Sequence, residues 1–141
     1  MQTLTMIYRS ILFALSIGIA ANLTAQDKPL PVLQYVDGHG NSYEFTEEGS
    51  SYLLEFEPVK KTTKSGSYSG GEPATRRISK ESYDKVLARM EQVIKKKRLT
   101  GTRERGTALI IKSVKGDIKE YILPKGSNDI KEIEALLYTL F

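Results

Sequence analysis

The residues that could do chemistry in this chain form only fragments of catalytic sets. His39 is the sole histidine among 141 residues, and it lies between two glycines in the turn-like stretch 37–41. Acyl-transfer chemistry needs a nucleophile, a base and a positioning group together, and nothing near His39 supplies the other two. We therefore expect His39 to be an exposed turn residue and the protein not to be an enzyme.

Two short patterns are similar to elements of serine acyl-transferases. Ser82-Tyr83-Asp84-Lys85 matches S-x-x-K, in which a lysine activates a serine one helical turn away, and Lys64-Ser65-Gly66 is similar to their K-T-G element. The two elements occur in reversed order, and the S-D-N element is missing. We interpret both matches as coincidence and expect Lys85 on the solvated face of a helix.

Glutamates on strand-like segments carry the remaining catalytic hypothesis. Glu55 and Glu57 are two residues apart, so on a strand they share a face, and Glu44 belongs to the preceding strand-like segment. A close pair of carboxylates can split its pKa values and so provide an acid and a base. Alternating charges on an outer strand face are common in ordinary domains, so a small carboxylate-dependent enzyme is the least favoured hypothesis.

No metal site or cofactor is predicted. Asp37, Asn41 and Glu48 have the approximate spacing of a calcium loop, but Ser42 occupies the position where the sharp turn needs glycine. The flanking segments are strand-like, whereas an EF-hand needs helices. A looser calcium site at this turn is the alternative that stays open. The chain has no cysteine, which excludes disulfides, thiol catalysis and thiolate metal ligands.

A run of small residues, 65–71, is the most distinctive surface feature of the sequence. It contains neither a P-loop nor a dinucleotide fingerprint, so a phosphate cradle is not predicted. We expect a long solvated loop that displays Tyr68 as a contact point, because an aromatic side chain gives contact area at low entropic cost. A loop that is only mobile is the alternative. The predicted partner-binding residues are Lys64, Ser67, Tyr68, Gly70 and Gly71.

Basic residues crowd the end of a helix predicted over 79–98 and the segment after it. They could meet an anionic lipid, an acidic polysaccharide or an acidic protein, at about 1 kcal/mol per residue near an anionic membrane. A solvated helix end, favoured by the helix dipole, is the alternative. The net charge of +4 is mild and no aromatic residues are interleaved, so nucleic acid is not a predicted partner. The predicted anionic-surface residues are Lys95, Lys96, Lys97, Arg98, Arg103 and Arg105.

Residues 1–25 are predicted to be a cleaved secretory signal peptide. One positive charge, Arg9, precedes the apolar run 10–21, which is shorter than the roughly 20 residues that span a bilayer. Ala25 places a small side chain at the cleavage point. This segment is similar to the signal peptides of bacterial exported proteins, which implies a periplasmic or secreted chain with no transmembrane segment after cleavage.

The remainder, 26–141, is predicted to be one small α+β domain. A mainly antiparallel sheet is expected, in the order β-β-β-(long Gly/Ser loop)-α-β-β-α, with the helices packed on one face. Ser79 is the expected N-cap of the first helix, and a second helix is expected after Asn128. Hydrophobic patterning predicts strands over 32–36, 42–46, 51–57, 108–111 and 118–123.

These observations favour a small exported, non-enzymatic binding module. Its protein or anionic partner would contact the small-residue loop, the basic helix end, or both. The alternative is an inhibitor of an exported hydrolase, with the loop plugging the active-site cleft of its target. The mild positive charge counts against basic lysozymes as targets, because complementary charge aids encounter.

Overall fold

The strands and helices of the chain are seen in a computed structural model that describes residues 30–63, 66–96 and 102–141. The predicted signal peptide, 1–25, lies outside the described residues. The elements, in chain order, are β1 (Leu33–Val36), β2 (Ser42–Glu48), β3 (Ser51–Glu57), β4 (Lys60–Thr63), β5 (Gly66–Ser69), β6 (Ala74–Ser79), α1 (Lys80–Lys95), β7 (Ala108–Val114), β8 (Asp117–Leu123) and α2 (Asn128–Tyr138).

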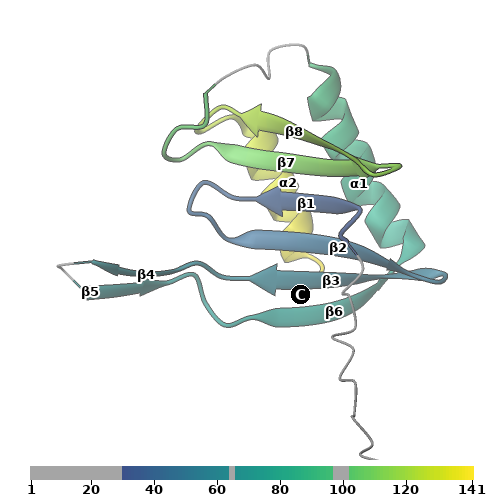
Figure 1. The fold of residues 1–141 in the computed structure, drawn as a ribbon, viewed down its shortest axis with the longest axis horizontal. Helices are drawn as coiled ribbons and strands as arrows, with labels where there is room; N and C mark the ends of the chain where they lie inside the picture. The colour runs from purple at the N-terminus through teal and green to yellow at the C-terminus, as the bar shows by residue number, and fades with distance from the viewer. Residues whose placement is uncertain (1–29, 64–65, 97–101) are drawn as a thin grey trace, which may run out of the picture.

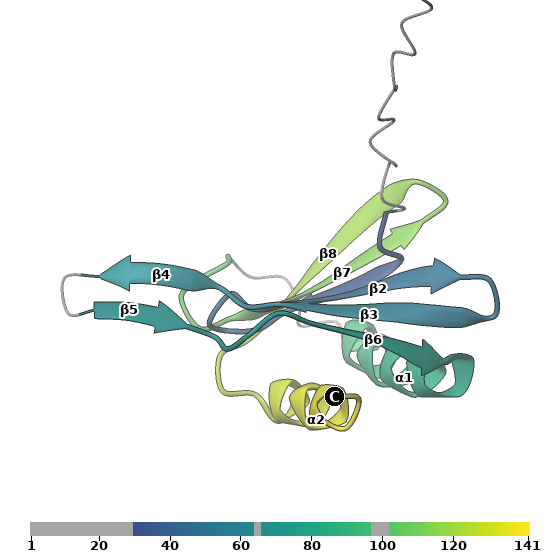
Figure 2. The same ribbon diagram turned by 90° about the horizontal axis from the view of Figure 1, so that it is seen from below.

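An antiparallel sheet covered on one face by both helices forms the body of the protein. Its six strands lie in the order β6-β3-β2-β1-β7-β8 (Figure 1). Figure 2 shows α1 and α2 side by side beneath the sheet. β6 and β7 run in the same direction with three strands between them, and α1 provides the crossover that joins them. The predicted α+β class, with a mainly antiparallel sheet, is confirmed.

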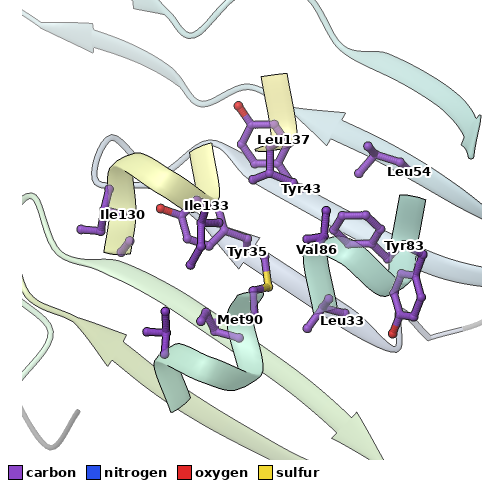
Figure 3. Packing of buried hydrophobic residues seen from close by; sticks show 14 of the residues in the cluster. Leu33, Tyr35, Tyr43, Leu54, Tyr83, Val86, Met90, Ile130, Ile133 and Leu137 are labelled. Atoms are coloured by element: carbon purple, nitrogen blue, oxygen red, sulfur yellow. The ribbon is translucent and has the colours of Figure 1, made fainter. Parts of the chain in front are cut away.

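The hydrophobic core lies between the sheet and the two helices. Side chains alternate across the pleated strands, so every second residue of the central strands faces the helices. Leu33 and Tyr35 of β1 and Phe45 of β2 are fully covered, each 0% exposed. Met90 of α1 and Ile133 of α2 approach the same layer from the helical side (Figure 3). The two helices therefore share one core with the central strands.

The first helix begins where the sequence predicts it. Ser79 is the N-cap, and its Oγ accepts a hydrogen bond from the Ser82 backbone N–H at 3.2 Å. The regular helix ends at Lys95, earlier than the predicted Arg98, and 97–101 lie outside the described residues. The predicted apolar stripe is confirmed, with Tyr83, Val86, Met90 and Val93 buried and Leu87 and Ile94 partly buried.

The Ser79 cap is expected to stabilise α1 measurably. Ser79→Ala is expected to lower the free energy of unfolding by about 1 kcal/mol, because an N-terminal N–H of α1 loses its side-chain acceptor. Ser127 caps α2 through a longer bond to Ile130 N, 3.4 Å, so Ser127→Ala is expected to cost less. Urea denaturation of the two variants and the parent measures both values, and an unchanged midpoint for Ser79→Ala would contradict the cap.

The prediction of a long loop before α1 is wrong. The residues between β3 and α1 form three strands, β4, β5 and β6, and the connections that join the described elements here are short. β4 and β5 are built from Lys, Thr, Gly, Ser and Tyr, which give no apolar alternation to detect. β6 is an edge strand in which Ile78 is the one buried residue, while Arg76 and Arg77 are exposed. Charged edge strands of this kind protect a sheet from pairing with other chains, and they weaken the sequence signal.

Candidate functional site

The β4–β5 hairpin is set apart from the six-stranded sheet of the described chain. Its strands form a separate two-stranded antiparallel sheet and pair with no other strand among the described residues. Figure 2 shows the hairpin extending beyond the end of the six-stranded sheet, to the side of the region that the helices cover. The hairpin is therefore an arm attached to the body only at its base.

The predicted partner-binding residues fall on this arm or at its base. Tyr68 lies in β5, opposite Lys61 of β4. The predicted loop setting is wrong, because these residues belong to a paired strand and to the segment that joins it to β6. Lys64 lies outside the described residues. The others are Ser67 and Tyr68 in β5 and Gly70 and Gly71 directly after it.

A β-bulge separates the hairpin from the sheet. Phe56 pairs with Ala74 in the sheet and Lys60 with Ser69 in the hairpin, so three residues, 57–59, face four, 70–73. The extra residue shifts the register by one and bends the ribbon, as bulges do. Gly71 has a φ of +117°, a backbone conformation that favours glycine. The bulge thus sets the angle at which the arm leaves the body.

Asn41 holds the base of the arm. Its Oδ1 accepts a hydrogen bond from the Val59 backbone N–H at 3.0 Å, and Gly70 N donates to Val59 O at 3.1 Å. Gly70 packs so closely on this side chain that a Cβ at position 70 would lie 2.0 Å from Asn41 Oδ1. One buried amide therefore joins the β1–β2 turn to both strands of the hairpin base.

Asp37 fixes Asn41 in turn. Its Oδ1 accepts hydrogen bonds from the backbone N–H groups of His39, Gly40 and Asn41 at 2.8–2.9 Å, and its Oδ2 accepts from Asn41 Nδ2 at 2.7 Å. Asp37 and Asn41 are both buried, 9% and 7% exposed. A carboxylate with this many donors is well satisfied, and it orients the Asn41 amide so that Oδ1 faces Val59.

The β1–β2 turn contains His39 and Asp37, which the sequence raised as a candidate catalytic base and a candidate calcium ligand. His39 is exposed at the turn, as predicted. The residues with calcium-loop spacing are not brought together. Asp37 accepts hydrogen bonds within the turn, whereas Glu48 lies at the far end of β2 and pairs with Arg77 at 2.8 Å. No group of three or more acidic or histidine side chains suited to a metal ion occurs among the described residues.

A cleft opens beside the base of the arm. It has a volume of about 290 Å³ and is lined by Tyr43 and Phe56 of the sheet, Tyr138 and Phe141 of the C-terminal region, and the polar residues Asn41 and Glu72. The Tyr43 and Phe56 rings are 4.9 Å apart between centroids. The cleft could not be predicted from the sequence, because its residues come from four separate segments.

A tyrosine and a carboxyl group form a hydrogen-bonded pair in the core beside Tyr43 of the cleft. Tyr35 Oη donates a hydrogen bond to Glu134 Oε1 of α2 at 3.1 Å. Burial raises the pKa of Glu134 above its usual range, and the hydrogen bond from Tyr35 opposes that rise. Burial also raises the pKa of Tyr35, and it raises that of Tyr43 to about 12. Both phenols are therefore neutral and can act as donors near neutral pH.

The raised pKa of Glu134 predicts a dependence of stability on pH. A carboxyl whose pKa is higher in the folded than in the unfolded state contributes stability below its unfolded pKa and loses it as pH rises through the folded pKa. Between about pH 4 and pH 7 the parent is therefore expected to lose stability relative to Glu134→Gln, which cannot ionise. Urea denaturation across this range measures the difference, and a constant difference would contradict the assignment.

One member of the predicted anionic-surface cluster, Lys96, forms an ion pair within the protein. Lys96 Nζ lies 2.6 Å from Asp129 Oδ1, and Arg89 also contacts Asp129, at 2.7 Å. Arg89 binds Glu132 of α2 as well, at 2.7 Å. These pairs tie the end of α1 to the start of α2 and lower the pKa of Asp129, chiefly through the hydrogen bond from Lys96. Lys96 thus has an architectural role that the sequence did not indicate.

The other members of that cluster are dispersed. Lys95 is exposed at the end of α1, and Arg103 and Arg105 are exposed in the segment before β7. Lys97 and Arg98 lie outside the described residues. Three of the predicted cations, Lys95, Arg103 and Arg105, are therefore exposed on two separate described segments.

The carboxylates of the catalytic hypothesis lie on the sheet face away from the helices. Glu44 and Glu55 are directly opposite each other on β2 and β3, and Glu57 is two residues further along β3. Glu44 Oε1 accepts a hydrogen bond from Gln34 Nε2 at 2.9 Å. In the S-x-x-K pattern, Lys85 pairs with Glu81 at 2.9 Å on the exposed side of α1, as predicted for a solvated helix face.

Comparison with known protein families, with curated proteins and with solved structures found no match to this chain. Neither of the two described helices is both long and apolar enough to cross a membrane. The arm, its base and the cleft are therefore the features that indicate a function.

Proposed function

We propose that this chain is an exported, non-enzymatic binding module that presents the β4–β5 hairpin to a protein partner. The observation that carries the proposal is a projecting ribbon, paired only with itself among the described strands, whose base is held by a buried asparagine. The exported setting comes from the predicted signal peptide.

The rigid base supports a presenting role. An isolated two-stranded hairpin is marginally stable in water, so a projecting hairpin needs support from its attachment. Asn41 supplies that support through Val59, and Asp37 holds Asn41. Preorganising a contact element reduces the entropy lost on binding, which is how a small arm can reach useful affinity.

The backbone of the hairpin offers a way to bind a protein. A two-stranded ribbon has two outer edges, and an extended segment of a partner can add to either one through main-chain hydrogen bonds. Tyr68 on β5 is the aromatic residue of this ribbon, and aromatic side chains are common anchors in interfaces. These features favour a protein partner over an anionic surface, for which only dispersed cations are available.

An inhibitor of an exported hydrolase is the second candidate. The narrow projecting shape of the arm favours it, because a ribbon can enter the active-site cleft of another protein (Figure 1). A panel of purified peptidases and glycosidases distinguishes the two functions. Inhibition that disappears when the arm is removed would support the inhibitor, and a uniformly negative panel would leave the binding module.

Removing the arm tests the proposal. Val59 and Gly70 already face each other through a 3.1 Å hydrogen bond, so Asn-Gly in place of 60–69 is expected to close the chain without disturbing the sheet. A body of unchanged stability that no longer crosslinks to the partner in the native cell is the expected result. Lys115→Asn, which creates the same Asn-Gly turn between β7 and β8, is the control. The same crosslinked partner at equal yield without the arm would overturn the proposal.

A further inference from the structure

The cleft at the base of the arm has an unusual lining for a surface hollow. Three of its rings form a mutual cluster, with centroid distances of 4.9 Å for Tyr43–Phe56, 6.1 Å for Phe56–Phe141 and 6.3 Å for Tyr43–Phe141. Tyr138 supplies a fourth ring and is 73% exposed, and Phe141 is 39% exposed. Large aromatic surface that is left open around a hollow marks a place where a ligand is expected to bind.

The charged residue in the lining of the cleft is a carboxylate. Glu72 is an exposed residue in the lining of the cleft. Burial raises the pKa of the Tyr43 hydroxyl to about 12, and the nearby Tyr138, Asp37 and Glu134 add to that rise in this order. Arg76 lies outside the cleft lining, and its guanidinium is engaged in donating to the Phe141 carbonyl oxygen at 3.4 Å. The potential in the cleft therefore favours a positive group.

Aromatic faces and a carboxylate together define a class of ligand. A cation is attracted to the negative faces of Tyr and Phe rings, and a flanking acid adds charge complementarity. The volume of about 290 Å³ lies at the lower end of small-molecule pockets, which suits one side chain better than an extended ligand. Asn41 lines both the cleft and the hairpin base, so a partner held by the arm can reach the cleft.

We infer that this cleft receives a lysine or arginine side chain of the protein partner that the β4–β5 hairpin holds. The inference rests on the proposed function, and it specifies one cationic side chain of the partner. The aliphatic part of the side chain lies against Phe56 and Phe141, and its charged end lies near Glu72 and the Tyr138 ring.

Small probes test the cleft without knowledge of the partner. Butylguanidinium and butylurea have the same shape and differ in charge, so their binding to the purified protein can be compared by NMR titration. We expect upfield shifts of the butyl protons from the aromatic rings, and a dissociation constant about five-fold lower for butylguanidinium than for butylurea. Equal affinity for the two probes would overturn the inference.

Two variants locate the effect. Glu72→Gln is expected to abolish the preference for the cation while leaving butylurea binding unchanged, and Tyr138→Ala is expected to weaken both probes. Both residues are exposed, so neither change is expected to unfold the protein. Glu120→Gln, on the exposed edge strand β8, is the matched control and is expected to change nothing. A preference that survives Glu72→Gln would contradict the assignment.

A last comparison separates this inference from the proposed function. If the arm captures a partner in the cell, Glu72→Gln is expected to lower the yield of that crosslink several-fold, and Glu120→Gln is not. Capture that needs the arm but is insensitive to Glu72→Gln would overturn the inference and leave the proposed function standing. If the cleft binds butylguanidinium but Glu72→Gln does not change the crosslink yield, the ligand is a free organic cation. This result would also overturn the inference.

Discussion

Asp37→Ala is expected to lower the free energy of unfolding by about 3 kcal/mol, the largest single effect of any polar substitution at the base of the arm. The change removes Oδ1, which accepts from three backbone N–H groups, and Oδ2, which accepts from the Asn41 amide, while Gly40 N keeps its bond to the Asp37 backbone oxygen. Because Asp37 and Asn41 are buried, water replaces these hydrogen bonds only in part. Guanidinium or urea denaturation measures the change.

Asp37→Asn is the matched control for that experiment. An asparagine keeps one carbonyl oxygen for the backbone donors and loses the second acceptor, which bonds Asn41 Nδ2 at 2.7 Å. It is therefore expected to cost less than the alanine, about 1–2 kcal/mol. Alanine and asparagine variants of equal stability to the parent would contradict the description of the turn.

Gly70→Ala is expected to destabilise the protein by about 2 kcal/mol and to displace the arm. Its Cβ would lie 2.0 Å from Asn41 Oδ1 and 2.8 Å from Asn41 Cγ, both far inside van der Waals contact. The Asn41 side chain must then move away, which breaks its hydrogen bond to Val59 N. Denaturation gives the stability, and NMR shifts of Val59 and Gly70 amides report the change at the base.

A double-mutant cycle isolates the cause. Asn41→Ala removes the three atoms that would lie nearest to the new Cβ, so Gly70→Ala in that background is expected to cost much less than in the parent. The expected coupling is about 1–2 kcal/mol. Strictly additive costs would show that the glycine is needed for another reason.

The sequence predicted the body of the fold well. Apolar alternation located the strands at Tyr43 and Phe45, and a serine cap located the start of α1 at Ser79. These signals are local, since each depends on residues a few positions apart. The burial of Ile130, Ile133 and Leu137 in α2 follows from the same kind of periodicity.

The arm and its base could not be predicted in the same way. β4 and β5 consist of Lys, Thr, Gly, Ser and Tyr, so their sequences show no apolar alternation. The link from Asp37 through Asn41 to Gly70 joins segments up to about thirty residues apart, and nothing in the sequence near Gly70 indicates that it must lack a side chain. The aromatic cleft depends on Tyr138, which is not among the buried residues of α2, and on Phe141, which follows the helix.

The most direct test of the central claim places a photo-crosslinking residue on the arm. Tyr68→benzoylphenylalanine puts the probe on β5, and Lys119→benzoylphenylalanine puts it on β8, at the opposite region of the sheet. Irradiation in the native cell is predicted to give one discrete crosslinked protein from position 68 and not from position 119. No product from position 68, or the same products from both positions, would contradict the claim that the hairpin is the binding arm.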